Sequence, residues 1–149
     1  RGREYGVRIF RLDDELRRSL GSFSTRVAAL EAEVAGAKSP GQGYLLGRKL
    51  DQARKDELRG VAAEIATLAY NELAARSIAS TQDALPKSSA DQTGAAVLNA
   101  SFLVAHDRID EFRAAVTELV RAHERRGFRV EFTGPWPPYH FTRERTDVR

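Results

Sequence analysis

Three histidines, His106, His123 and His140, are the residues best suited to acid–base or metal chemistry. His106 precedes Asp107, but a carboxylate at the start of an amphipathic stretch is better used as a helix cap. His123 follows Leu119 by four residues, at the edge of an apolar stripe, which is typical of a partly buried structural histidine. No two histidines are four residues apart and no H-E-x-x-H motif occurs, so the usual helical metal site lacks its ligands. We therefore predict no catalytic, cofactor-binding or metal-binding residue.

A glycine-rich segment, 41–49, ends in Arg48 and Lys49 and at first sight suggests a phosphate loop. A Walker loop that begins at Gly41 would need glycine at position 46, which is Leu46. One that begins at Gly43 would need glycine at position 48, which is Arg48. A helix N-terminus beside two cations could hold an anion, but helix initiation alone explains the glycines. No serine lies in a G-x-S-x-G motif either.

The motif Pro135-Trp136-Pro137-Pro138 contains P-x-x-P, the pattern that aromatic grooves recognise in polyproline ligands. It directly follows an expected strand, and three large aromatic residues lie in or just after it. We therefore favour a packed end to the strand that buries Trp136, Tyr139 and Phe141, and keep ligand or partner contact as the alternative. His140 is expected to pack or to lie at the surface.

The composition fits one domain with a sizeable core. The chain has 149 residues, of which 42% are hydrophobic and 30% are charged. Because it lacks cysteine, thiol catalysis, disulfides and zinc–thiolate sites are excluded. The net charge is +3 and the pI is about 9.5, but the two signs alternate along the chain, whereas nucleic-acid binding favours segregated charge. The apolar runs are too short for a membrane-spanning helix, and the missing initiator methionine suggests a piece of a longer protein.

The first half predicts a strand followed by helices. Residues 4–10 alternate as a strand with one buried face. A short helix begins at Asp13 and Asp14 and ends near Gly21, and a second helix begins at about Ser24. After a turn at 38–43, helical spacing extends from about 44 to 80, which is about 50 Å and more than one small core can cover. This helix must therefore project, bend or fold back.

The second half predicts a strand, a helix and a strand. Residues 76–81 are either the end of the helix or, as we favour, a weak strand, and a polar, mobile loop follows at about 82–94. Residues 96–104 form the central strand, and Asp107 caps a helix that ends before Gly127. A last strand begins at Phe128 and ends at the prolines, which cannot donate to a ladder. The fold class is therefore α+β: a modified ferredoxin-like sandwich with an antiparallel sheet and an enlarged helical insertion after the first strand.

Four stretches, read in order, resemble the gas vesicle GvpF/GvpL family: EYGVRIF at 4–10, SPGQGYLLGRKL at 39–50, VLNASFLV at 97–104 and TGPWPPYHF at 133–141. Tyr5 replaces a usual tryptophan, and His140 a usual serine. The motif residues, which we interpret as structural, are Tyr44, Leu45, Leu46, Asn99, Gly134, Pro135, Trp136, Pro137, Pro138 and Tyr139.

The resemblance implies a C-terminal ferredoxin-like domain at 1–141, with a helical insertion at about 13–80, a charged tail at 142–149 and the parent's N-terminal domain absent. It also implies a non-enzymatic accessory or minor structural protein of gas vesicle formation. The expected partners are the shell protein GvpA and other gas vesicle proteins, with no membrane and no cofactor. The expected location is the gas vesicle and the cytoplasm.

A shell subunit that is apolar on its gas-facing side must be masked before assembly. We expect the long helix and the edge strand to offer surplus apolar surface for this purpose. The predicted partner-binding residues are Leu58, Val61, Ile65, Leu68 and Ile78. The alternative is a nucleic-acid-binding ferredoxin-like module, which would need aromatic residues on the exposed sheet face.

Overall fold

The computed structural model describes residues 2–85, 94–137 and 141. Its strands form one antiparallel sheet in the order β2-β3-β1-β4. They are β1 (Gly2–Arg11), β2 (Ala79–Gln82), β3 (Ala96–Ala105) and β4 (Phe128–Trp136). Helical crossovers follow the first and third strands, so the ferredoxin-like order confirms the predicted fold class.

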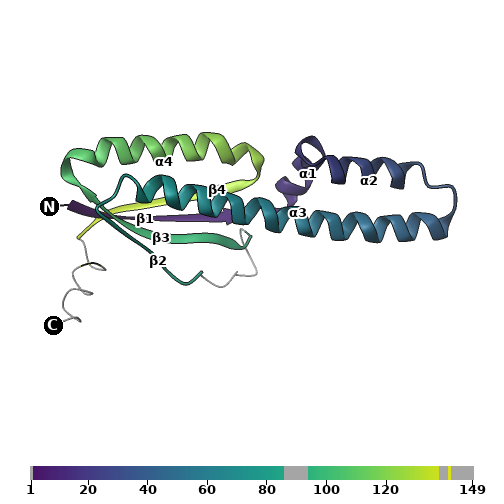
Figure 1. Cartoon of the computed structure of the whole chain (residues 1–149), viewed down its shortest axis with the longest axis horizontal. Helices are drawn as coiled ribbons and strands as arrows, with labels where there is room; N and C mark the ends of the chain where they lie inside the picture. Colours follow the sequence, from purple (N-terminus) through teal and green to yellow (C-terminus); the bar gives the residue numbers. More distant parts are fainter. Residues whose placement is uncertain (1, 86–93, 138–140, 142–149) are drawn as a thin grey trace.

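Two helices pack on one face of this sheet. The longer helices are α1 (Asp13–Phe23), α2 (Thr25–Ala35), α3 (Pro40–Ala74) and α4 (Ile109–His123), with short turns η1 (His106–Arg108) and η2 (Glu124–Arg126). The C-terminal half of α3 and α4 cover the same sheet face, whereas α1 and α2 lie beyond the end of the sheet (Figure 1). The opposite sheet face is called the second face below. No helix among the described residues is long and apolar enough to cross a membrane.

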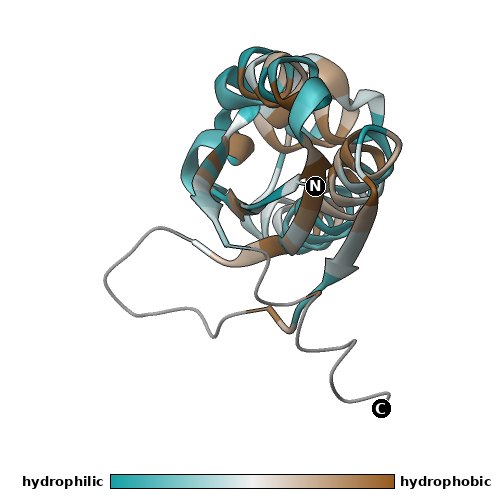
Figure 2. Ribbon diagram, turned by 90° about the vertical axis from the view of Figure 1, so that its left-hand side faces the viewer, coloured by the Kyte–Doolittle hydropathy of each residue, from teal (hydrophilic) through white to brown (hydrophobic). Residues whose placement is uncertain are grey.

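The core lies between the first sheet face and these helices. The predicted alternation is confirmed: Tyr5, Val7 and Ile9 of β1 are buried together. The Tyr5 ring stacks on Phe112 of α4 at 5.7 Å and on Phe132 of β4 at 5.3 Å between ring centroids. Seen along the long axis, apolar residues line the space between strands and helices (Figure 2).

The long helix α3 is unbroken over 35 residues and is therefore about 52 Å long. Of the three expected arrangements, it projects beyond the sheet, and α2 folds back along its outer half (Figure 1). Ser24 donates a hydrogen bond to Glu57 at 3.0 Å, and Arg54 pairs with Glu31 at 3.0 Å. We call this paired region, residues 24–57, the helical arm.

The boundaries of α3 correct the predicted range of about 44–80. The helix begins at Pro40 because Ser39 caps it: the Ser39 hydroxyl accepts from the Gln42 N–H at 3.1 Å. The Gln42 side chain in turn accepts from the Lys38 N–H at 2.9 Å. This reciprocal cap, with proline in the first turn, converts most of the expected turn into helix. The helix ends at Ala74, and β2 (Ala79–Gln82) overlaps the predicted 76–81 region.

The two short helices meet at Ser24. As predicted, Ser24 begins the second helix, and its hydroxyl accepts from the Val27 N–H at 3.1 Å. The predicted break at Gly21 is wrong, because α1 continues to Phe23. A Cβ at Gly21 would lie 2.6 Å from a Glu31 carboxylate oxygen, so the Glu31 side chain of α2 lies close to this position inside α1.

Strand β4 also continues further than expected. Trp136 pairs with Glu4 and Thr133 pairs with Gly6, so Gly134 and Pro135 lie in a bulge opposite one β1 residue. Proline is tolerated there because β4 is an edge strand. Gly134 has φ +108°, and a Cβ on it would lie 2.8 Å from the Glu4 carbonyl oxygen.

The turn before α4 differs from the prediction as well. Asp107 lies inside η1, and α4 begins at Ile109 without a side-chain cap. The expected cap at Asp107 is therefore wrong, since the 3-10 turn displaces the helix start. Gly127 is confirmed as the residue after the last turn, with φ +105° and its Cβ position 2.8 Å from the Leu16 backbone N.

Several expectations fall on residues outside the described ranges. Of the loop predicted at about 82–94, only 82–85 and 94 are described, and Gln82 belongs to β2. The Asp83 N–H donates to the Asn99 carbonyl oxygen at 2.8 Å, so this part continues along β3. Pro138, Tyr139, His140 and the tail 142–149 lie outside the described residues.

Candidate partner-binding surfaces

The predicted stripe on α3 is divided between the core and the surface. Leu58 and Ile65 are buried in the core, and Val61 is half-buried against it. Leu68 is 52% exposed and Ile78 is 55% exposed. Leu58 and Ile65 are therefore not accessible to a partner, because the apolar face of α3 packs against β3, α4 and the two short helices. Only Leu68 and Ile78 remain available to a partner.

Ile78 lies at the start of an edge strand. Its N–H donates to the Leu103 carbonyl oxygen at 2.7 Å, which fixes the entry to β2. The hydroxyls of Tyr70 and Ser80 are 2.8 Å apart and join α3 to β2. Because β2 is the last strand on its side of the sheet, its outer backbone groups have no strand partner within the described chain. Such an edge can accept an extended segment.

The family-motif residues of α3 lie at the end of the helical arm. Tyr44 and Leu45 are exposed, whereas Leu46 is half-buried and turns toward the inner side of the arm. Arg48 and Lys49 follow one turn later and are also exposed. The structure thus places the first two motif side chains outside any core.

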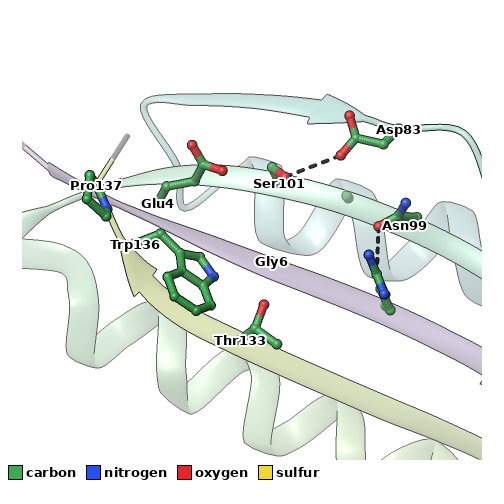
Figure 3. A pocket seen from close by; sticks show the side chains of 10 residues that line it. Glu4, Gly6, Asp83, Asn99, Ser101, Thr133, Trp136 and Pro137 are labelled. Atoms are coloured by element: carbon green, nitrogen blue, oxygen red, sulfur yellow. Dashed lines mark hydrogen bonds between the residues drawn. The ribbon is translucent and has the colours of Figure 1, made fainter. Parts of the chain in front are cut away.

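Residues of two other motifs come together on the second face of the sheet. A groove of about 760 Å³ runs across β3, β1 and β4 (Figure 3). Its lining includes Glu4, Arg8, Asp83, Asn99, Ser101 and Trp136. Asn99 and Trp136 are far apart in the sequence, and only the sheet brings them together. Pro137 also lines the groove.

Asn99 holds the segment after β2 against the sheet. Its side-chain oxygen accepts from Arg8 Nε at 3.2 Å, and its side-chain nitrogen donates to the Ala84 carbonyl oxygen at 2.9 Å. The Ser101 hydroxyl donates to an Asp83 carboxylate oxygen at 3.3 Å. These contacts favour our structural interpretation of Asn99. Sequence reasoning missed Arg8 and Asp83, since neither carried a signal beyond strand alternation and a polar loop.

Trp136 is exposed, which corrects the expectation that it packs inside. It is 52% exposed, and its ring lies over the second face beside Thr133 (Figure 3). The bulge at Gly134 sets this direction, because it changes the pairing of β4 with β1 just before Trp136. Pro135 and Pro137 are exposed as well, whereas Phe141 is buried as expected.

Two of the three histidines, His106 and His123, lie in the described part of the chain. His106 is exposed and His123 is half-buried. Burial, and after it the nearby Arg126 charge, lowers the pKa of His123 below its ordinary value. Within residues 2–85, 94–137 and 141, no group of three histidine, aspartate or glutamate side chains could hold a metal ion.

The sheet order and the projecting arm define a ferredoxin-like α+β domain with a helical extension. Residues 2–143 match the family described as gas vesicle synthesis protein GvpL/GvpF. The chain therefore belongs to the GvpL/GvpF family, as the sequence resemblance indicated.

Solved structures with this fold include two gas vesicle proteins. The gas vesicle protein GvpF from Anabaena sp. PCC7120 matches with a TM-score of 0.61 and 20% identity, over 93% of this chain and 53% of that one. GvpF from Microcystis aeruginosa matches with a TM-score of 0.55 and 18% identity, over the same shares. At these identities the likeness shows the fold.

Curated relatives match over a shorter segment. Gas vesicle protein F2 of Halobacterium salinarum is 49% identical over 45 residues, which is 30% of this chain and 20% of that protein. Gas vesicle protein F of Haloferax mediterranei is 44% identical over 45 residues, or 21% of its length. This chain thus spans about half of the solved relatives and aligns with about a fifth of the curated ones.

Proposed function

We propose that this chain is a non-enzymatic accessory or minor structural protein of gas vesicle formation that binds the shell protein GvpA. Family membership supports the link to gas vesicles. The observation that carries the binding proposal is Ile78, a large apolar side chain that is 55% exposed beside β2, whose outer edge has no strand partner among the described residues. Its working place is the gas vesicle and the surrounding cytoplasm. We further propose that the chain is the C-terminal domain of a longer protein, which agrees with its coverage of about half of each solved relative.

The physical reason is the chemistry of a gas-filled shell. A subunit whose inner side faces gas exposes apolar surface before assembly, and such surface aggregates in water. An edge strand with an adjacent apolar side chain can pair with an extended segment and cover part of that surface. Covering a few hundred Å² at about 25 cal/mol per Å² contributes several kcal/mol before the costs of association. A binding free energy of this size suits a contact that forms and dissociates during assembly.

The test is capture of GvpA by the tagged chain when both are produced in one cell. We expect the double variant Leu68→Ser, Ile78→Ser to capture at least about tenfold less GvpA, because both side chains are exposed and the fold does not depend on them. The matched control is Tyr44→Ser with Leu45→Ser, which removes two large apolar side chains that are even more exposed, and it should leave capture unchanged. No capture by the unaltered chain would contradict the proposed function. Equal capture by both double variants would contradict the proposed site.

The nucleic-acid alternative has one observation in its favour. Trp136 is an exposed aromatic residue on the second face, and Arg8 lines the same groove. However, two carboxylates, Glu4 and Asp83, line that groove as well, which opposes a polyanion. We expect no gel shift with single-stranded RNA at physiological salt. A shift that weakens steeply as salt is added would support this alternative instead.

A further inference from the structure

The end of the helical arm exposes the two most accessible large apolar side chains among the described residues. Tyr44 is 64% exposed and Leu45 is 63% exposed. Leu46 and Leu50 supply the inward side of the same turns, and Leu50 is buried in the core. Tyr44 and Leu45 are therefore not needed to hold α3 against α2. A Cβ at Gly41, one turn earlier on the same outer face, would meet nothing within 4 Å.

A groove lies along the arm between α2 and α3 and has a volume of about 540 Å³. It is lined by Arg26, Ala29, Leu30, Glu33, Lys49 and Gln52. Lys49 is one turn after Leu45 on the same side of α3, so the exposed pair precedes the groove along the helix. We call the groove together with Tyr44 and Leu45 the arm-end surface.

The charges around this surface are predominantly positive, and Glu33 is the one carboxylate among the residues that line the groove. Lys38, Arg48 and Lys49 are exposed, and no carboxylate of the described chain lies within ion-pair distance of any of them. Further down the arm the cations are paired, with Arg54 on Glu31 and Arg26 on Asp56. No acidic residue occurs between positions 34 and 50. The arm end is thus a cationic patch around an apolar centre, which is complementary to an acidic partner.

We propose that the arm-end surface docks an acidic amphipathic helix of a gas vesicle protein other than GvpA. The proposal rests on the gas vesicle function proposed above and adds a second partner. The apolar side of that helix covers Tyr44, Leu45 and the groove floor, and its carboxylates face Arg48 and Lys49. Tyr44 and Leu68 are 24 positions apart on one helix, which is about 36 Å. The two surfaces therefore lie at separate ends of α3 (Figure 1), and the chain bridges two vesicle components.

A second copy of this chain fits the surface less well. A twofold contact would bring the cations of one arm end against those of the other, and like charges oppose such pairing. Self-association through Tyr44 and Leu45 is nevertheless measurable. A concentration-dependent dimer that Tyr44→Ser with Leu45→Ser abolishes would overturn the proposal.

The experiment places a photoreactive phenylalanine analogue at position 44 of the tagged chain, produced together with the gas vesicle proteins of its own organism. We expect crosslinks to a helix of one gas vesicle protein other than GvpA, at a site with carboxylates within a turn. The same analogue at position 121, on the exposed side of α4, is the control and should give at least about tenfold less of that product. Crosslinks only to GvpA, or equal labelling from both positions, would overturn the proposal.

Charge reversal gives a second, independent measurement on the captured complex. Arg48→Glu with Lys49→Glu should weaken capture of the crosslinked protein about tenfold and remove most of its salt dependence. The matched control is Arg17→Glu with Arg18→Glu, which makes the same change in charge at an exposed pair on α1. If both charge-reversal variants captured the same amount of the crosslinked protein, the proposal would be overturned. The two proposals fail separately. If the chain still captures GvpA but neither arm variant changes capture of another gas vesicle protein, only the proposed arm contact is contradicted.

Discussion

Replacing Ile65 or Leu68 by alanine should separate the buried from the exposed side of α3. The two residues are three positions apart on one helix, yet Ile65 is 2% exposed and Leu68 is 52% exposed. Ile65→Ala removes three carbon groups from the core, which costs about 2.4 kcal/mol at about 0.8 kcal/mol for each buried methylene. A partly collapsed cavity adds about 1 kcal/mol, so the free energy of unfolding should fall by about 3–4 kcal/mol.

Leu68→Ala should change the free energy of unfolding by less than about 0.5 kcal/mol, because little area is lost and alanine has the higher helix propensity. In a domain of this size, the Ile65→Ala variant should lower Tm by about 7–14 °C. Urea denaturation followed by far-UV circular dichroism measures both variants, with thermal unfolding as a check. A loss at Leu68 as large as at Ile65 would show that α3 is turned differently. That result would also contradict the assignment of Leu68 to a partner surface.

Three further results are expected. Gly134→Ala should destabilise the fold by about 1–3 kcal/mol because its φ is +108° and Glu4 crowds the Cβ position, whereas Gly60→Ala, in open space on α3, should stabilise it by about 0.5–1 kcal/mol; denaturant midpoints that move together would contradict this. His123 has a folded-state pKa below its unfolded value, so its contribution is complete above about pH 6.5 and declines as the pH falls; the drop in Tm between pH 7.5 and 5 should be smaller in His123→Gln, and an equal drop would refute it. Ser24→Ala removes the cap of α2 and should cost about 1 kcal/mol by urea denaturation, with Ser22→Ala, exposed on α1, as the control that stays near zero.

The predicted elements succeeded where the signal is local. Alternation in β1 and β3 needs only neighbouring residues, and the start of α2 at Ser24 follows from one side chain and one nearby N–H. Prediction failed at Gly21 because glycine is typical of helix ends, whereas α1 continues through it to Phe23. It failed at Pro135 because the bulge depends on how β4 pairs with β1.

The candidate sites show the same division. Sequence motifs singled out Tyr44, Asn99 and Trp136. They did not indicate that Tyr44 is exposed at the arm end or that Asn99 and Trp136 line one groove. Hydrophobic spacing marked Ile65 and Leu68 alike as apolar positions of one helix. Spacing along a helix cannot say how wide a face its neighbours cover.

The sequence by itself determined the order of strands and helices, the family and the absence of thiol chemistry, because these depend on residue types and short-range periodicity. The tertiary structure alone decided which side of α3 is covered, where Trp136 points and which charges stay unpaired. Those features depend on contacts between segments far apart in the chain, and such contacts exist only once the sheet and the arm have formed.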